Sequence, residues 1–246
     1  MDKKLLRRWN EAIARRQGSL VITDIESGEQ RFFGINEDWQ NDPLANEIAK
    51  RLKTGRSGMV TTEEGQRFFL NITVPPIRLV IIGAVHISQA LAPMARIAGL
   101  DVLIIDPRTA FSSPERFPDF PLIADWPQDI EKQMALDRFT ALVAVTHDPK
   151  IDDFPLMKAL QNDCLYVGAL GSRKTHAKRE LRLSDAGVPT DQLPRIQAPI
   201  GLNIGAASPA EIAVAILAQI IQSLRAPEVG QSEPLNSKSL QSGVEA

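Results

Sequence analysis

The sequence predicts an α/β protein in which a small α+β domain precedes a doubly wound parallel sheet. Before Pro75-Pro76 the predicted elements follow the order α-β-β-α-β-β, and after it strands and helices alternate. The first strand of the alternating part, Leu79–Ile82, is a continuous apolar run, which is typical of a strand buried on both faces. We therefore expect one domain at residues 1–74 and a second at residues 77–226, because the proline pair stiffens the chain between them.

The N-terminal domain is predicted to begin with an amphipathic helix over residues 3–16, whose apolar side chains fall on one stripe. Four strands in two hairpins are expected at residues 19–23, 30–34, 58–62 and 67–73. Between the hairpins, Asp42 followed by Pro43 has the pattern of an N-cap with proline at the first helical position. This helix should continue to about Lys53 and end at Gly55.

The second domain is predicted to alternate strands and helices. Its strands are expected at residues 79–82, 101–106, 140–145 and 164–170, with a short apolar piece of unassigned structure at 122–124. Its helices are expected at 86–98, 127–136, 152–161, 172–186 and 208–224. The last helix opens with the capping box Ser208-Pro209-Ala210-Glu211 and is apolar almost all round, so we expect it to be buried. Residues 227–246 are rich in Ser, Gln, Glu and Gly and are expected to be disordered.

Composition excludes several classes of function. The net charge of −2 gives no reason to expect a nucleic acid or an anionic membrane as partner. No apolar run reaches the length of a membrane span and the N-terminus lacks the pattern of a signal peptide, so a cytoplasmic location is expected. The single cysteine, Cys164, begins a buried strand and is expected to be a core residue rather than a nucleophile. His86 and His176 have no neighbouring ligands at metal-binding spacing, so we predict no metal site built by the protein.

The turn after the first strand of the second domain has part of a dinucleotide-binding fingerprint. Gly83, Val85 and Ser88 occupy the places of the glycines in Gly-x-Gly-x-x-Gly/Ala, and Asp106 ends the next strand 23 positions after Gly83. In a Rossmann fold such an acid binds a ribose hydroxyl, but a strand-end aspartate before proline is also an ordinary turn residue. Val85 carries a branched side chain where pyrophosphate approaches the backbone, so NAD(P) is the less favoured ligand.

Two later segments carry stronger chemical signals. Thr146-His147-Asp148 closes an apolar strand, where His147 could exchange a proton near neutral pH, or where the flanking residues could simply cap the next helix while His147 packs beneath the loop. The segment from Gly168 through Gly171 to Ser172-Arg173 combines a strand, glycines and a helix N-terminus, which predicts an anion site. Lys174, Lys178 and Arg182 follow at helical spacing. For Lys178 and Arg182 a solvated basic face is the preferred interpretation.

These segments together resemble the XdhC/CoxI family. The matching blocks are Gly83-Ala-Val-His-Ile-Ser-Gln-Ala-Leu-Ala-Pro93, Asp106-Pro-Arg108, Thr146-His-Asp148, Tyr166-Val-Gly-Ala-Leu-Gly-Ser-Arg173, and Pro199-Ile-Gly-Leu-Asn-Ile-Gly-Ala206 followed by Pro209-Ala-Glu-Ile-Ala213. The likeness spans about residues 77–222. The family comprises maturation factors of molybdenum hydroxylases of the xanthine and carbon monoxide dehydrogenase type.

The resemblance implies a chaperone without turnover of its own. Such a protein would bind the molybdenum cofactor, as molybdopterin or its cytidine dinucleotide form, protect it while its terminal sulfur ligand is installed, and insert it into a xanthine dehydrogenase-like enzyme. A cysteine desulfurase-type sulfurtransferase is a further implied partner, and a homodimer is an open alternative. The residues expected to contact the cofactor are Gly83, His86, Asp106, Arg108, Thr146, His147, Asp148, Gly168, Gly171, Ser172, Arg173, Gly201 and Gly205.

Two departures from the family pattern affect these expectations. Many members carry Gly-Gly-Cys-x-Glu in the N-terminal domain, and no residue of this chain matches that cysteine, so its role does not carry over. The family's nucleotide turn usually reads Gly-x-Gly-His, so Val85 is unusual as well. Two other functions stay open at this point: an NAD(P)-binding oxidoreductase, and a scaffold that docks a molybdoenzyme and a sulfurtransferase through the basic helix.

Overall fold

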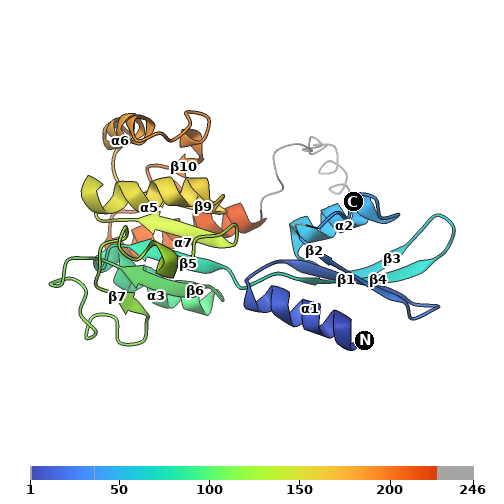
Figure 1. The fold of residues 1–246 in the computed structure, drawn as a ribbon. Helices are drawn as coiled ribbons and strands as arrows, with labels where there is room; N and C mark the ends of the chain where they lie inside the picture. Colours follow the sequence, from blue (N-terminus) through green and yellow to red (C-terminus); the bar gives the residue numbers. More distant parts are fainter. Residues whose placement is uncertain (1, 36, 226–246) are drawn as a thin grey trace, which may run out of the picture.

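A computed structural model of the chain describes residues 2–35 and 37–225, so the predicted disorder of residues 227–246 lies outside the described residues. The chain forms two sheets with helices around each (Figure 1). The elements of the N-terminal part are α1 (Lys3–Ala14), β1 (Ser19–Asp24), β2 (Gln30–Gly34), α2 (Ala45–Thr54), β3 (Gly58–Thr61) and β4 (Arg67–Thr73). The elements of the C-terminal part are β5 (Arg78–Ile82), α3 (His86–Ile97), β6 (Asp101–Ile105), β7 (Leu122–Ile123), α4 (Glu131–Met134), β8 (Thr140–Ala144), α5 (Pro149–Gln161), β9 (Tyr166–Ala169), α6 (Arg173–Asp185), the 3₁₀ turn η1 (Leu193–Arg195), β10 (Ile196–Gln197) and α7 (Pro209–Arg225).

The N-terminal sheet is antiparallel with the strand order β2-β1-β4-β3, and one helix covers each of its faces (Figure 1). Successive side chains of a strand point to opposite faces, which divides the core in two. Leu20 and Ile22 pack with Ile48 of α2, whereas Val21 packs with Leu5 of α1. The predicted order α-β-β-α-β-β is therefore observed.

The C-terminal sheet is parallel throughout, with the strand order β10-β9-β8-β5-β6-β7. Counted from β5, the strands lie in the order 3-2-1-4-5-6, which is the order of the Rossmann fold. Helices cover both faces. Leu79 and Ile81 of β5 belong to the core formed with α3 and α7, whereas Val80 and Ile82 belong to the core that includes residues of α4, α5 and α6. The predicted doubly wound α/β architecture is confirmed.

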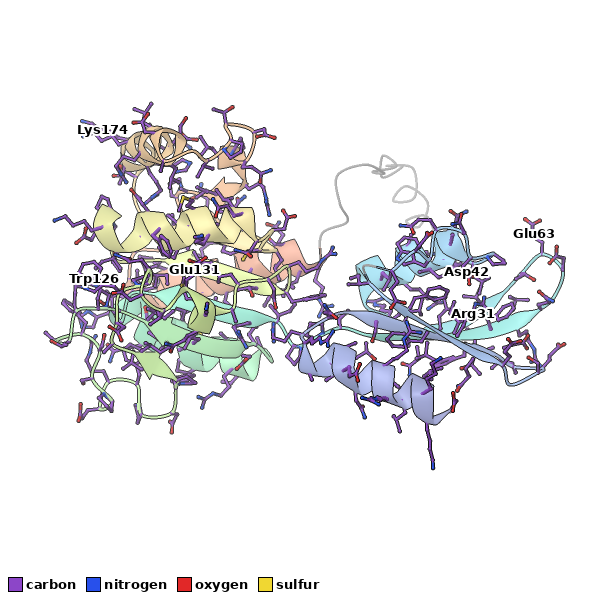
Figure 2. All side chains as sticks on the ribbon, in the orientation of Figure 1. Arg31, Asp42, Glu63, Trp126, Glu131 and Lys174 are labelled. Carbon is purple, nitrogen blue, oxygen red and sulfur yellow. The ribbon has the colours of Figure 1, made fainter. Side chains whose placement is uncertain are left out.

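Two helices begin or end differently from the prediction. Helix α2 begins at Ala45 rather than at Pro43, because the residues before it form a turn in which the Ala45 amide donates to the Asp42 carbonyl at 2.9 Å. The Asp42 carboxylate accepts from the backbone of Leu44 and pairs with Arg31 of β2 at 2.6 Å (Figure 2). Gly55 ends this helix in the left-handed conformation, as predicted. The helix expected at residues 127–136 is reduced to the four residues of α4, because a turn precedes it and Ala135 adopts a positive φ of 45°.

Helix α7 is not buried all round, contrary to the prediction. Ala213, Ile216 and Ile220 are buried, whereas Val214 is 48% exposed and Ile221 is 39% exposed. The helix lies in the outer layer and packs against α3, so only one of its faces has protein to contact. Apolar residues on nearly all sides of this helix therefore did not mean that all of its sides are buried.

A short link and an ion pair join the two parts. Strand β4 ends at Thr73 and β5 begins at Arg78, so residues 74–77 connect the sheets. The Arg16 guanidinium contacts Asp137 at 2.9 Å and donates to the carbonyl of Pro76. None of the described helices has the length and apolar character needed to cross a membrane.

Candidate functional site

The candidate site lies at the carboxyl edge of the parallel sheet. Every strand of this sheet runs in the same direction, so the loops that follow β5, β6, β8 and β9 meet at one edge. The order reverses between β5 and β8, and ligands of doubly wound folds bind at this switch point. The fold thus brings the Gly83 turn, Asp106 and Thr146–Asp148 together, as the sequence predicted.

Gly83 is required by both conformation and space. Its φ is +117°, which side-chain-bearing residues rarely adopt, and a Cβ there would lie 2.9 Å from Cγ2 of Thr146. Val85, at the place of the second fingerprint glycine, has an extended backbone with φ −99° and ψ 179°. A branched residue adopts this conformation without strain. The first glycine of the fingerprint is therefore enforced by the fold, whereas the second is not.

Asp106 holds the turn together from inside. Its side chain is fully buried, and its Oδ2 accepts from the Ala84 amide at 2.8 Å and from Nη2 of Arg108 at 2.7 Å. Its Oδ1 accepts from the amide and Nε of Arg108 at 3.0 and 2.9 Å. The hydrogen bonds that the Arg108 guanidinium donates to Asp106 raise the pKa of Arg108. Of the two interpretations of Asp106, this geometry matches the turn residue, because all its bonds are made within the protein.

Arg116 is a site residue that sequence reasoning missed. Its Nη1 donates to the carbonyl of Ala84 at 2.7 Å and to that of Phe111 at 2.8 Å, and its Nη2 contacts Gln89 at 3.1 Å. The guanidinium of Arg108 stacks over the Phe111 ring at 4.3 Å. These contacts hold the loop after β6 against the Gly83 turn, so that Arg108, Phe111 and Arg116 form a wall beside the turn. The sequence contained one indication of these contacts: the loop is rich in arginine and phenylalanine, and guanidinium groups stack on aromatic rings.

The N-terminus of α3 lies directly behind this turn and has no side-chain cap. Val85 is its N-cap residue and accepts no hydrogen bond through its side chain, and His86, the first helical residue, is exposed. The first amides of a helix have no intrahelical acceptor, and the helix dipole adds positive potential at this end. The α3 N-terminus can therefore bind an anion through its backbone, next to exposed His86.

The segment after β8 forms a helix cap and a buried polar pair. Asp148 accepts from the Lys150 amide at 2.9 Å and so caps α5. The hydroxyl of Thr146 donates to Oδ1 of Asp152 at 2.7 Å and accepts from the amide of Asp148. His147 has a positive φ of 65° and an exposed side chain that borders a pocket. The capping interpretation is thus correct for Asp148, but His147 does not pack beneath the loop.

The segment after β9 also caps its own helix. Gly171 has a φ of 134°, and Ser172 accepts from the Thr175 amide at 3.2 Å as the N-cap of α6. Gly168 does not lie in this turn: it is inside β9, where a Cβ would lie 2.6 Å from the hydroxyl oxygen of Tyr166. Arg173 is exposed at the first position of α6. The predicted anion turn therefore has the expected shape, with one of its amides already bonded to Ser172.

The glycine loop before α7 is fastened by a glutamine that the sequence did not indicate. Oε1 of Gln219 accepts from the Gly201 amide at 2.8 Å and from the Tyr166 hydroxyl at 2.7 Å. Gly201 has a φ of 91°, and a Cβ there would lie 3.0 Å from that of Ala215. Gly205 has a φ of 73° and is exposed, and a Cβ added there would have no described atom within 4 Å. Gly201 thus lets the loop approach α7, and Gly205 lies in an open turn.

A pocket of about 290 Å³ lies between α5 and α6, beside His147. Two of its residues, Asp152 and Arg179, are almost fully buried, and burial raises the pKa of Asp152 to about 6. Arg182 pairs with Asp153 through two hydrogen bonds of 2.6 and 3.0 Å. Lys178 and Arg182 therefore border a pocket instead of forming only a solvated face. The remaining lining residues are His147, Pro149, Lys174 and Thr175.

The other chemically reactive groups of the sequence are accounted for by packing. Cys164 is buried, and burial raises the pKa of its thiol to about 12, so the prediction of a core cysteine is confirmed. Burial also lowers the pKa of His176. Within residues 2–35 and 37–225, no group of three or more His, Cys, Asp or Glu residues is placed to hold a metal ion.

Comparison with known proteins identifies relatives of the C-terminal part. The family model described as the XdhC Rossmann domain matches residues 79–220. A protein of Bacillus subtilis (strain 168), named as a probable xanthine dehydrogenase subunit, is 29% identical over 205 residues, which cover 82% of this chain and 59% of that protein. The molybdenum cofactor insertion chaperone PaoD of Escherichia coli (strain K12) is 28% identical over 146 residues, which cover 59% of this chain and 40% of PaoD.

A solved structure extends the likeness to both parts of the chain. A crystal structure described as a xanthine dehydrogenase from Bacillus halodurans is 25% identical, with a TM-score of 0.62. The match covers 93% of this chain and 66% of the crystallised chain. The chain therefore spans about half the length of each of these two relatives, 59% and 40%, and about two thirds of that crystallised protein.

Proposed function

This chain belongs to the XdhC family, and from that membership we propose that it is a maturation chaperone for the molybdenum cofactor. It binds the cofactor, protects it during installation of the terminal sulfur ligand, and inserts it into a molybdoenzyme of the xanthine dehydrogenase type. The molybdenum is cargo in this scheme, so the chain needs no metal-binding cluster of its own. The relative PaoD, which is named as a molybdenum cofactor insertion chaperone, supports the proposal.

The observation that carries the proposal is the uncapped N-terminus of α3 at the switch point of the sheet. The molybdenum cofactor carries phosphate, and helix amides that lack an acceptor bind phosphate well. The wall formed by Arg108, Phe111 and Arg116 borders the same turn. These residues shape and hold the site, and none of them is required to perform chemistry. The role of the chain is thus to bind and to shield, which fits a chaperone without turnover.

The same turn argues against a standard dinucleotide cofactor. A Rossmann dehydrogenase binds the adenosine ribose with a free carboxylate at the end of its second strand. Here that carboxylate, Asp106, accepts four hydrogen bonds from Ala84 and Arg108 and has no exposed surface. NAD(P) would have to displace a bidentate arginine to reach it. The oxidoreductase hypothesis is therefore the weaker one, and titration with NADH and NADPH tests it. Binding at micromolar concentrations would restore it.

The cofactor content of the purified protein tests the proposal. Protein prepared anaerobically from a molybdate-fed host should release about one equivalent of fluorescent pterin per chain after acid oxidation, together with molybdenum. His86→Asp places a negative charge at the α3 N-terminus, where an acidic residue does not harm the helix. It should lower the pterin content several-fold, whereas the neutral control His86→Asn should not. Absence of pterin and molybdenum from the wild-type protein would overturn the proposal.

Partners and the form of the cofactor belong to the same proposal. The recipient is a xanthine dehydrogenase-type molybdoenzyme, and a cysteine desulfurase-type sulfurtransferase supplies the sulfur ligand. The cytidine dinucleotide form would bring a second phosphate to the sheet edge. Analysis of released nucleotide distinguishes the two forms, because only the dinucleotide yields CMP on hydrolysis. Co-purification with a molybdoenzyme of this type, and sedimentation of the isolated chain, test the partner and the homodimer.

A further inference from the structure

The pocket between α5 and α6 contains a buried arginine whose donors are largely unused. Arg179 is 2% exposed and lines the pocket. Its Nη2 donates to the carbonyl of Leu170 at 2.9 Å, but its Nε and Nη1 have no hydrogen-bond partner among residues 2–35 and 37–225. A buried donor without an acceptor is costly, and native structures seldom leave one empty. Nε and Nη1 lie on different edges of the guanidinium, so each can donate separately to an oxygen of a bound anion.

A buried acceptor lies in the same pocket. Oδ1 of Asp152 accepts from the Thr146 hydroxyl at 2.7 Å, whereas Oδ2 has no donor within the described part of the chain. Asp152 and Arg179 attract each other electrostatically but form no hydrogen bond. A ligand that contacts both side chains accepts from the guanidinium and donates to the carboxylate. Phosphate that carries one proton does both, through its anionic oxygens and its P–OH.

The mouth of the pocket is positively charged. Lys174 and Lys178 border it, and neither pairs with an acid in the described part of the chain. Figure 2 shows Lys174 projecting outward from α6. The second acid at the pocket, Asp153, is already paired with Arg182. The free charges of the mouth are therefore cationic and attract an anion toward Arg179.

From these groups we propose that the α5–α6 pocket is a phosphate-binding site, with Arg179 as its internal ligand and Lys174 and Lys178 at its mouth. Oδ2 of Asp152 accepts a hydrogen bond from the P–OH of the bound phosphate. The cavity of about 290 Å³ has room for a phosphate group together with part of an attached ester. The site is separate from the α3 N-terminus, and its ligands are side chains instead of backbone amides.

Binding of inorganic phosphate tests the site without reference to the cofactor. Titration calorimetry on the full chain, in a buffer free of phosphate and sulfate, should show one phosphate bound per chain. Lys174→Gln combined with Lys178→Gln should weaken binding at least tenfold, and Arg179→Met should abolish it. The matched control removes two exposed lysines outside the pocket, Lys132→Gln with Lys150→Gln, and should bind as the wild type does.

Several outcomes would overturn the site. Failure of the wild-type chain to bind phosphate would do so, and so would equal weakening by the two lysine pairs. Acetate binding as tightly as phosphate would show a carboxylate site instead. If Arg179→Met does not fold, the exposed lysine pair decides the question.

The source of the phosphate rests on the proposed function and is tested separately. If the phosphate belongs to the molybdenum cofactor, the pterin content should fall in the Lys174→Gln, Lys178→Gln variant and not in the matched control. If the wild-type chain carries pterin but binds no phosphate, the proposed phosphate site is wrong and the proposed function is unaffected. Phosphate binding by a wild-type chain that carries no pterin would defeat the proposed function alone, and the pocket would then take another phosphate ester.

Discussion

The Gly83 turn and the α5–α6 pocket lie at the same sheet edge but offer ligands opposite kinds of groups. At the turn the side chains are occupied, because Asp106, Arg108 and Arg116 bond to one another or to the backbone. The α3 amides behind them have no side-chain cap. At the pocket the helices are capped by Asp148 and Ser172, whereas the side chains of Asp152 and Arg179 keep free atoms.

This difference shows why a motif alone did not locate the binding groups. The segment with the best-known fingerprint uses its conspicuous acid to hold the protein together. The pocket has no named motif, yet within the described part of the chain it retains buried donors without a partner, which native structures seldom leave unbonded. Four changes test the comparison, in order of decreasing expected effect.

Replacing Gly83 should have the largest effect. Gly83→Val forces a branched residue to a φ of +117° and places its Cβ against Thr146, so we expect a loss of about 4 kcal/mol in the free energy of unfolding. Urea denaturation measures it. The control is Gly65→Ala, where φ is +84° but nothing lies within 4 Å of the new Cβ. This change should cost only about 1 kcal/mol. Equal costs would show that close packing at the turn is unimportant.

Asp106→Asn should have the next largest effect on the free energy of unfolding. It weakens the bidentate pair with Arg108 and leaves a buried amide against donors, for an expected loss of about 2–3 kcal/mol. Asp101→Asn is the matched control, because Asp101 is half-exposed and pairs with Arg78 only at 3.5 Å. Its cost should stay below about 0.5 kcal/mol. Tight NADH binding by the wild type would contradict the assignment of Asp106 to the turn.

Asp152 should make stability depend on pH in the direction opposite to that of a paired carboxylate. Burial raises its pKa from 3.8 to about 6, so between these values the folded state binds a proton that the unfolded state has released. Its contribution to stability therefore falls as the pH rises through this window, by up to about 1.4 kcal/mol for each pH unit. Arg179 and Asp153 also face this carboxyl group.

The pH dependence of Asp152→Asn reports this effect. The variant removes the titrating group and keeps an acceptor for Thr146, so the difference in unfolding free energy between variant and wild type should change across pH 4–6. Identical pH profiles would show that Asp152 does not titrate in this range. Added phosphate should reduce this difference between variant and wild type, because a hydrogen bond from its P–OH stabilises the ionised carboxylate of Asp152.

The smallest expected effect concerns the helix cap of α6. Ser172→Ala removes the acceptor for the Thr175 amide and should cost about 1 kcal/mol. Phosphate affinity at the α5–α6 pocket should not change, because Ser172 is a cap and not a lining residue there. Ser208→Ala, which removes the acceptor for the Glu211 amide, is a control of similar cost on α7. A large loss of phosphate affinity in Ser172→Ala alone would return the anion site to the Gly171 turn.

The sequence allowed much of the fold to be predicted, because its signals are local. Apolar runs predicted the parallel strands, and the positive φ of Gly55, Gly83 and Gly171 agrees with their places at turns. The predictions for α4 and for the burial of α7 were wrong. Each depends on what packs against the helix, which periodicity does not reveal.

The candidate site was predicted only in part. The sheet edge and the segments that meet there were correctly identified, since strand ends and helix starts are local features. Arg116, Gln219 and Arg179 were missed, because each acts on a residue far away in sequence: Arg116 on Ala84, Gln219 on Tyr166, and Arg179 on the pocket at α5. A single polar residue in a loop or on a basic helix has no pattern that marks it.

By itself the sequence determined the α/β class, the alternation of strand and helix, and the resemblance that placed the chain in its family. These follow from hydrophobic period, glycines at turns and short motifs, which are properties of neighbouring residues. Only the tertiary structure decided which polar groups are satisfied. Both carboxylate oxygens of Asp106 accept hydrogen bonds, whereas Nε and Nη1 of Arg179 have no partner in the described part of the chain, because hydrogen bonds and burial depend on elements brought together by folding. That difference, more than any motif, locates the candidate phosphate site.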